Sequence, residues 1–163
     1  MTAWALVLEL LALLSIVPAA AAQERIISKP DADMIFAFTR AEWEKYVRQV
    51  APPEGWTMRL VPVEMGTGLS SFNRSTGIGM SVQPVYPDDQ GPPQMLVVGS
   101  YYPRGSMRIT DDVLQRIEQS AQLDLRPAYF VSAKHAQMPG TNMEGIELTV
   151  TRDAVDPPGS KGK

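Results

Sequence analysis

The sequence predicts an α+β domain in which a mainly antiparallel sheet carries two helices on one face. Six short segments are apolar, or alternate between apolar and polar residues, as β-strands do. Two longer segments repeat apolar residues at helical spacing behind a threonine. Short turns rich in proline and glycine separate several of the strands, which favours antiparallel neighbours. With 163 residues, 44% of them hydrophobic and 20% charged, the chain can bury the core of one domain.

Residues 1–22 are predicted to be a signal peptide. An apolar run covers residues 3–17, and Ala20 and Ala22 form the pattern of small residues that precedes a cleavage site. Cleavage after Ala22 would leave Gln23 as the first residue of a periplasmic or secreted protein.

The alternative for this segment is a single uncleaved membrane anchor, which would be the only segment of the chain in a membrane. No lysine or arginine precedes the apolar run, and Glu9 lies within it, which is unusual for a signal peptide. An anchor must also count Pro18 and the alanines after it to reach about twenty residues, and it would bury Glu9 in the bilayer.

The predicted domain covers residues 23–152, and its first elements are a lead-in, a strand and a helix. Pro30 disfavours a helix in the lead-in, residues 23–33, and the apolar run Met34–Phe38 predicts a buried strand. Thr39 and Glu42 match a capping box, so a helix is expected to begin there. Its apolar face is formed by Trp43, Tyr46, Val47 and Val50, and Pro52 ends it.

Three strands are predicted next, over Trp56–Met65, residues 77–86 and Gln94–Tyr102. Pro62 and Pro84 lack a backbone N–H, which predicts sheet edges or bulges at both positions. Between the first two strands, Met65–Met80 is rich in glycine and hydroxylated residues and is interpreted as a flexible hairpin connection.

The second half repeats the order helix, strand, strand. Thr110 caps a helix with an apolar stripe, and strands are expected over residues 128–136 and 145–151. Residues 153–163 are predicted to be a disordered tail. Because a strand–helix–strand unit occurs twice, the expected topology is ferredoxin-like, a split β-α-β arrangement with an extra strand.

Composition excludes several kinds of chemistry. The chain has no cysteine, so thiolate nucleophiles, disulfides and metal sites built on cysteine are ruled out. The net charge is -3 without a basic stripe, which argues against nucleic acid as a partner. No cofactor motif with the required context is present, so no cofactor is predicted.

The Met65–Met80 segment is the first candidate site. Ser70, Ser71, Arg74 and Ser75 could bind an anion or a sugar. The segment does not fit a phosphate-binding loop, because a strand rather than a helix is predicted after its glycines.

His135, the only histidine, is the second candidate. As a general base it would need an acid and a nucleophilic serine in space, which nothing in the local sequence supplies. With Met138 and Met143 it could instead form a soft copper(I) site.

The first functional hypothesis is an exported, non-catalytic binding module whose partner is an envelope protein or a glycan. The alternatives are a small envelope hydrolase that uses His135 and a weak copper-handling protein.

Overall fold

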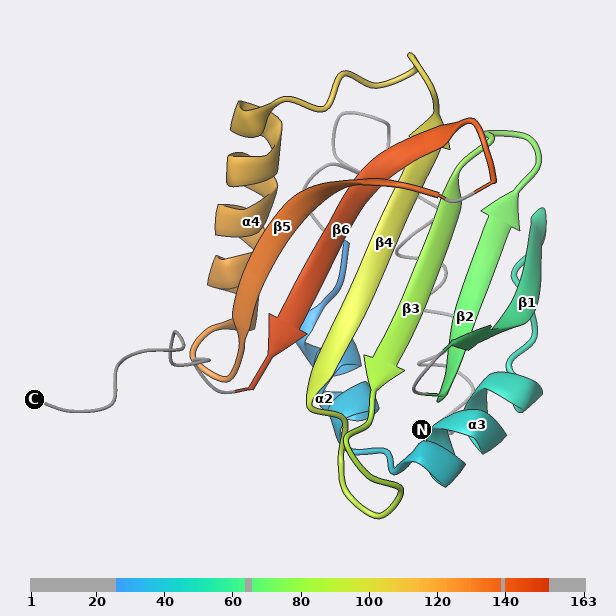
Figure 1. Cartoon of the computed structure of the whole chain (residues 1–163), viewed down its shortest axis with the longest axis vertical. Helices are drawn as coiled ribbons and strands as arrows, with labels where there is room; N and C mark the ends of the chain where they lie inside the picture. Colours follow the sequence, from blue (N-terminus) through green and yellow to red (C-terminus); the bar gives the residue numbers. More distant parts are fainter. Residues whose placement is uncertain (1–25, 64–65, 139, 153–163) are drawn as a thin grey trace, which may run out of the picture.

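A computed structural model describes residues 26–63, 66–138 and 140–152, so the predicted signal peptide and tail lie outside the described residues. The described residues form a single antiparallel sheet that is packed against helices on one face (Figure 1). The described helices are α2 (Lys29–Phe36), α3 (Arg40–Gln49) and α4 (Asp111–Leu125). The strands are β1 (Trp56–Val63), β2 (Gly66–Asn73), β3 (Gly79–Val85), β4 (Met95–Pro103), β5 (Phe130–Gln137) and β6 (Met143–Thr151).

The six strands lie in the order β1-β2-β3-β4-β6-β5, which confirms a mainly antiparallel α+β domain. The first four strands form a meander. The chain then crosses through α4 to the far edge, and β6 is inserted between β4 and β5. Only this second strand–helix–strand unit is split as predicted, and the ferredoxin-like topology as a whole is not confirmed. No helix among the described residues has both the length and the apolar character needed to cross a bilayer.

The strand predicted over Met34–Phe38 is wrong, because most of that segment belongs to α2. The lead-in is not extended either, since α2 begins at Lys29. Ser28 caps the helix, and Pro30 lies in the first turn, where its missing N–H has no helical partner to lose. The buried face of this helix includes Ala32, Ile35 and Phe36, and of these Ile35 and Phe36 belong to the apolar run.

The capping box predicted for the next helix is confirmed in α3. The Thr39 hydroxyl accepts a hydrogen bond from the Glu42 amide at 3.3 Å, and the Glu42 carboxylate accepts one from the Thr39 amide at 2.8 Å. These bonds fix the start of α3 so that Trp43 and Val47 are buried against the sheet.

Pro62 lies on the edge strand β1, as predicted, but Pro84 is buried in the central strand β3. The pairing of β2 with β3 stops at Leu69 opposite Val82. If this register continued, Thr67 would lie opposite Pro84, which has no N–H to donate. The Trp43 indole N–H donates to the Thr67 carbonyl at 2.7 Å instead. The sheet therefore tolerates Pro84, because the Trp43 side chain on α3 donates to the Thr67 carbonyl in place of the missing N–H of Pro84.

The opposite edge strand, β5, is covered by α4. The Val131 amide donates to the Gln122 side chain at 2.9 Å, and the Ala133 amide donates to the Glu118 carboxylate at 2.8 Å. These bonds occupy backbone donors that an exposed edge strand would offer to another chain.

Two tyrosines whose pKa values are raised, the buried Tyr129 and the partly buried Tyr46, predict a loss of stability at high pH. Burial raises the pKa of Tyr129 to about 12, and its hydrogen bond to Asp33 at 2.6 Å adds to the shift. Burial also raises the pKa of Tyr46 to about 12, with a smaller effect from Asp31.

The folded chain therefore keeps protons that the unfolded chain releases near pH 10. Since the unfolded state binds fewer protons above that pH, the free energy of unfolding falls as pH rises from about 10 to 12. Circular dichroism melts across this range should show a falling Tm, and the fall should be smaller in Tyr129→Phe. A Tm that stays constant up to about pH 12 would contradict this assignment.

Candidate functional site

The face of the sheet opposite the helices carries a row of polar side chains. Because directly paired residues share a face, the strand register puts these residues side by side. The row runs across the sheet as Arg59, Ser70, Ser81, Glu147 and Lys134, and Gly99 on β4 lies between Ser81 and Glu147. We refer to this surface, which is turned toward the reader in Figure 1, as the open face.

Tyr101 fills the middle of this row. A Cβ added to Gly99 would lie 2.6 Å from the Tyr101 ring, so the ring rests where a side chain at position 99 would be. The ring is only 7% exposed although it is on the open face, and burial raises the pKa of its hydroxyl. Beyond it, Lys134 and Glu147 form an ion pair at 2.8 Å, which raises the pKa of Lys134.

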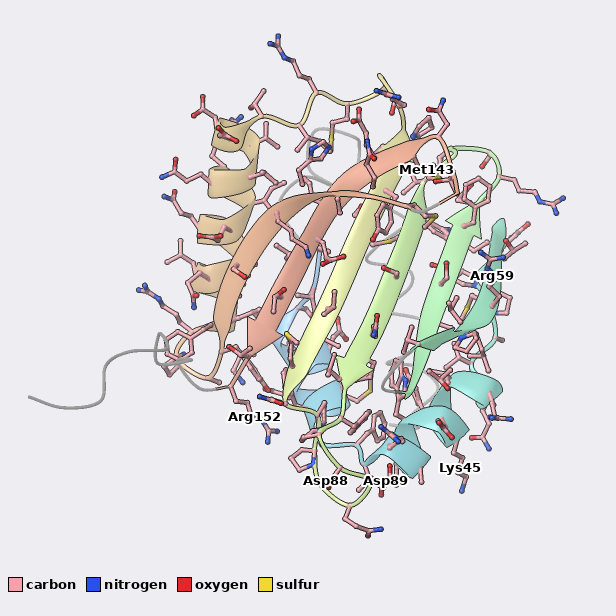
Figure 2. The ribbon with its side chains drawn as sticks, in the orientation of Figure 1. Lys45, Arg59, Asp88, Asp89, Met143 and Arg152 are labelled. Atoms are coloured by element: carbon pink, nitrogen blue, oxygen red, sulfur yellow. The ribbon has the colours of Figure 1, made fainter. Side chains whose placement is uncertain are left out.

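A groove of about 430 Å³ opens on this face beside the β5–β6 hairpin. The tip of the hairpin bends over β3, and the methyl groups of Met143 and Met138 lie 3.4 and 3.7 Å from the position of a Cβ on Gly79. The two methionines form one wall, and β1 and β2 form the floor and the other wall. Figure 2 labels one residue from each wall, Arg59 and Met143. The groove is lined by Thr57, Met58, Arg59, Ser70, Ser71, Phe72, Gly79, Met138, Thr141 and Met143.

Arg59 is the only charged residue among the described residues that line this groove. Its side chain is exposed, and within the stretches of chain that the structure describes it forms no ion pair. Ser70 lies directly opposite it on β2. Two of the other lining hydroxyls donate to the backbone, from Thr57 to Phe72 at 3.3 Å and from Thr141 to Met138 at 2.8 Å. Arg59 and Ser70 are thus neighbouring polar groups at one side of a largely apolar groove.

The flexible connection expected over Met65–Met80 is wrong, because its first half forms strand β2. β2 pairs with β1 along its whole length and with β3 from Leu69 to Phe72, which gives the backbone of these residues hydrogen-bond partners. Within the described part of this segment the loop is the turn after Asn73, where the Asn73 side chain accepts hydrogen bonds from the Ser75 amide and hydroxyl at 3.0 and 2.7 Å.

The four residues of the predicted anion or sugar site do not converge. Ser70 is on the open face. Its neighbour Ser71 points to the helix-covered face and is 5% exposed, because successive strand residues alternate. Arg74 and Ser75 lie in the exposed turn. Of the four, only Ser70 and Ser71 line the groove.

His135 lies on β5 with its Nε2 atom 3.5 Å from a Glu144 carboxylate oxygen. The register puts it opposite Ile146 on the helix side of the sheet, and Ile146 lies opposite Ser100. Two strand spacings, about 10 Å, therefore separate His135 from Ser100. Ser100 donates to the Tyr102 hydroxyl at 3.0 Å. The arrangement supplies an acid for His135, but Ser100, the serine in its cross-strand row, is too far away to act with it.

The copper candidates lie on different faces. Met138 and Met143 meet on the open face above Gly79, whereas His135 is on a position of the helix side. Among the described residues, no group of three or more histidine, aspartate and glutamate side chains is arranged to hold a metal ion.

Sequence reasoning missed Arg59 as a site residue. The signal was present, since a tight hairpin that pairs Val63 with Gly66 also pairs Arg59 with Ser70. The prediction of a flexible connection over Met65–Met80 left out the partner strand β2 and, with it, the neighbour of Arg59.

Comparison of the chain with protein-family models, curated proteins and solved structures found no match. The geometry of the open face is therefore the basis for assigning a function.

Proposed function

We propose that this chain is a non-catalytic binding module whose ligand occupies the groove on the open face. The observation that carries the proposal is the groove itself, about 430 Å³ between β1, β2 and the β5–β6 hairpin. This volume lies within the range of about 300–1,000 Å³ that is usual for small-molecule sites. Its lining joins apolar side chains to a few polar groups at one side, which is also typical of such sites.

A binding role is favoured over hydrolysis by the surroundings of the candidate residues. The groove contains neither His135 nor an acidic side chain among its described lining residues. His135 in turn is separated by two strand spacings, about 10 Å, from Ser100, the serine in its cross-strand row. A hydrolase would combine a binding groove with a general base in one site, but here the groove and His135 are in different places.

We further propose that the module is exported, with cleavage after Ala22, because residues 3–17 and the alanines after them fit a signal peptide. The ligand or partner would then belong to the cell envelope or its surroundings. Mass spectrometry of the native protein should find Gln23 at the amino terminus. Intact Met1 in a cytosolic fraction would contradict export without affecting the groove.

The binding site can be tested by filling it. Ser70→Trp would place an indole in the groove, and Ser132→Trp makes the same change on the same face but outside it. In amide NMR spectra with a set of small organic fragments, the wild type should show shifts concentrated at Thr57, Ser70, Phe72 and Gly79. These responses should be lost in Ser70→Trp and retained in Ser132→Trp.

A dispersed amide spectrum of Ser70→Trp shows that the variant is folded. If it is not, Thr57→Trp fills the same groove from the exposed strand β1. Fragment responses that concentrate instead between α4 and β5, around Glu118 and Leu123, would contradict the proposed site.

A further inference from the structure

We infer that the groove is selective for a small organic acid, with its carboxylate at Arg59 and its apolar body along Phe72, Met138 and Met143. This inference rests on the proposed binding function and adds the chemical class of the ligand.

The charge of the groove favours an anion. Arg59 is the only charged residue in the described lining, and no ion pair between described residues neutralises it. A guanidinium group donates two parallel hydrogen bonds to a carboxylate, in a geometry that an ammonium group cannot reproduce. The Ser70 hydroxyl, on the adjacent strand directly opposite Arg59, can donate to the same group. Two donors and one positive charge therefore gather at one end of the groove, and its described lining holds no carboxylate to compete for them.

The rest of the groove favours an apolar body. Phe72 is 38% exposed on β2, which leaves some of its ring available to a ligand. Met138 and Met143 form the facing wall, and methionine side chains adapt to apolar groups of varied shape. Gly79 supports this wall, because the absence of a side chain lets both methyl groups lie close to the sheet.

The distance between the two ends indicates the size of the ligand. Arg59 is on β1, and the methionine methyls lie over Gly79 on β3, two strand spacings away. These spacings amount to about 10 Å across the strands, and Gly79 also lies two residues, about 7 Å, along β3 from Ser81, which shares the row of Arg59. The ligand must therefore carry its carboxylate on an apolar group of medium length, and acetate is too short to reach both ends.

Octanoate is a suitable probe because it has both features. Octan-1-ol is the matched compound without the charge, and acetate is the matched compound without the chain. Amide shifts of Ser70 and Phe72 report binding in the groove. For the wild type we expect octanoate to bind at least about tenfold more tightly than octan-1-ol, as a charge-assisted hydrogen bond allows. Acetate should produce no saturable shift.

Variants at two arginines separate this charge effect from a general one. Arg59→Gln should weaken octanoate binding about tenfold or more and leave octan-1-ol binding unchanged. Arg59→Lys should lie between the two, since it keeps the charge but loses the paired hydrogen bonds. Arg48→Gln removes the same charge from an exposed position on α3, on the other side of the sheet, and should change nothing.

Each contrary result has its own meaning. If octanoate and octan-1-ol bind the groove equally and Arg59→Gln has no effect, the ligand class is wrong although the groove still binds. If neither these probes nor the fragments act at the groove, the proposed function itself fails. If the Ser70 and Phe72 shifts depend on protein concentration and not on octanoate, a second copy of the chain occupies the groove and the inference is overturned.

Discussion

Gly145→Ala is expected to destabilise the protein by about 3 kcal/mol or more, a large effect for the addition of one methyl group. A Cβ at this position would lie 1.9 Å from the Ser100 carbonyl oxygen and 2.8 Å from the Tyr101 Cα. Both are backbone atoms of β4, the strand that pairs with β6. They cannot move aside as a flexible side chain could, so β4 and β6 would have to separate in the middle of the sheet.

Urea denaturation followed by circular dichroism measures this loss. Gly68→Ala is the matched control, because its new Cβ would meet no atom closer than 3.7 Å. It should change stability by less than about 1 kcal/mol, since alanine is less costly to order than glycine. Equal losses in the two variants would show that the β4–β6 contact is looser than the structure indicates.

Trp43→Ala is expected to cause the second large loss of stability, lowering the free energy of unfolding by about 3–5 kcal/mol, which is usual for truncating a buried aromatic side chain. Trp43 is 2% exposed and belongs to the core, where its ring stacks with that of Tyr46. Its indole N–H also bonds the Thr67 carbonyl, which would otherwise face Pro84. Removing the side chain therefore removes packing and leaves a backbone carbonyl without its partner.

Trp43→Phe separates these two contributions. It retains most of the apolar packing but leaves the Thr67 carbonyl unpaired, which costs about 1–3 kcal/mol. Tyr46→Phe is the control, because the Tyr46 hydroxyl is buried without a hydrogen-bond partner among the described residues, and its removal should be neutral or stabilising. Chemical denaturation of the three variants in parallel gives the comparison. If Trp43→Phe were as stable as the wild type, the indole bond would have no role in holding α3 against the sheet.

Local signals account for the elements that the sequence predicted well. The capping box of Thr39 and Glu42 and the cap at Thr110 use residues within one turn of each other, and both are present in the structure. The prediction of a strand over Met34–Phe38 was wrong because a short apolar segment fits a buried strand and a buried helix equally well. The cap that marks this segment as a helix, Ser28, lies earlier in the chain.

The candidate site depended on pairings that no local pattern contained. Ser70 was named from its composition, but its neighbour Ser71 faces the other way once β2 is paired on both sides. The β1–β2 register puts Arg59 opposite Ser70. The β5–β6 hairpin, which lies across two other strands, brings Met143 to the groove. His135 and Met138 are only three residues apart, yet His135 occupies a position on the helix side of β5 and the Met138 methyl lies over Gly79 on the open face.

By itself the sequence determined an antiparallel α+β domain without cysteine chemistry, and it located α3 and α4, because capping and periodicity are properties of neighbouring residues. Only the tertiary structure decided which strands lie side by side. Strand order and register are set by contacts between residues far apart in the chain, and these contacts bring Arg59, Ser70 and the two methionines around one groove.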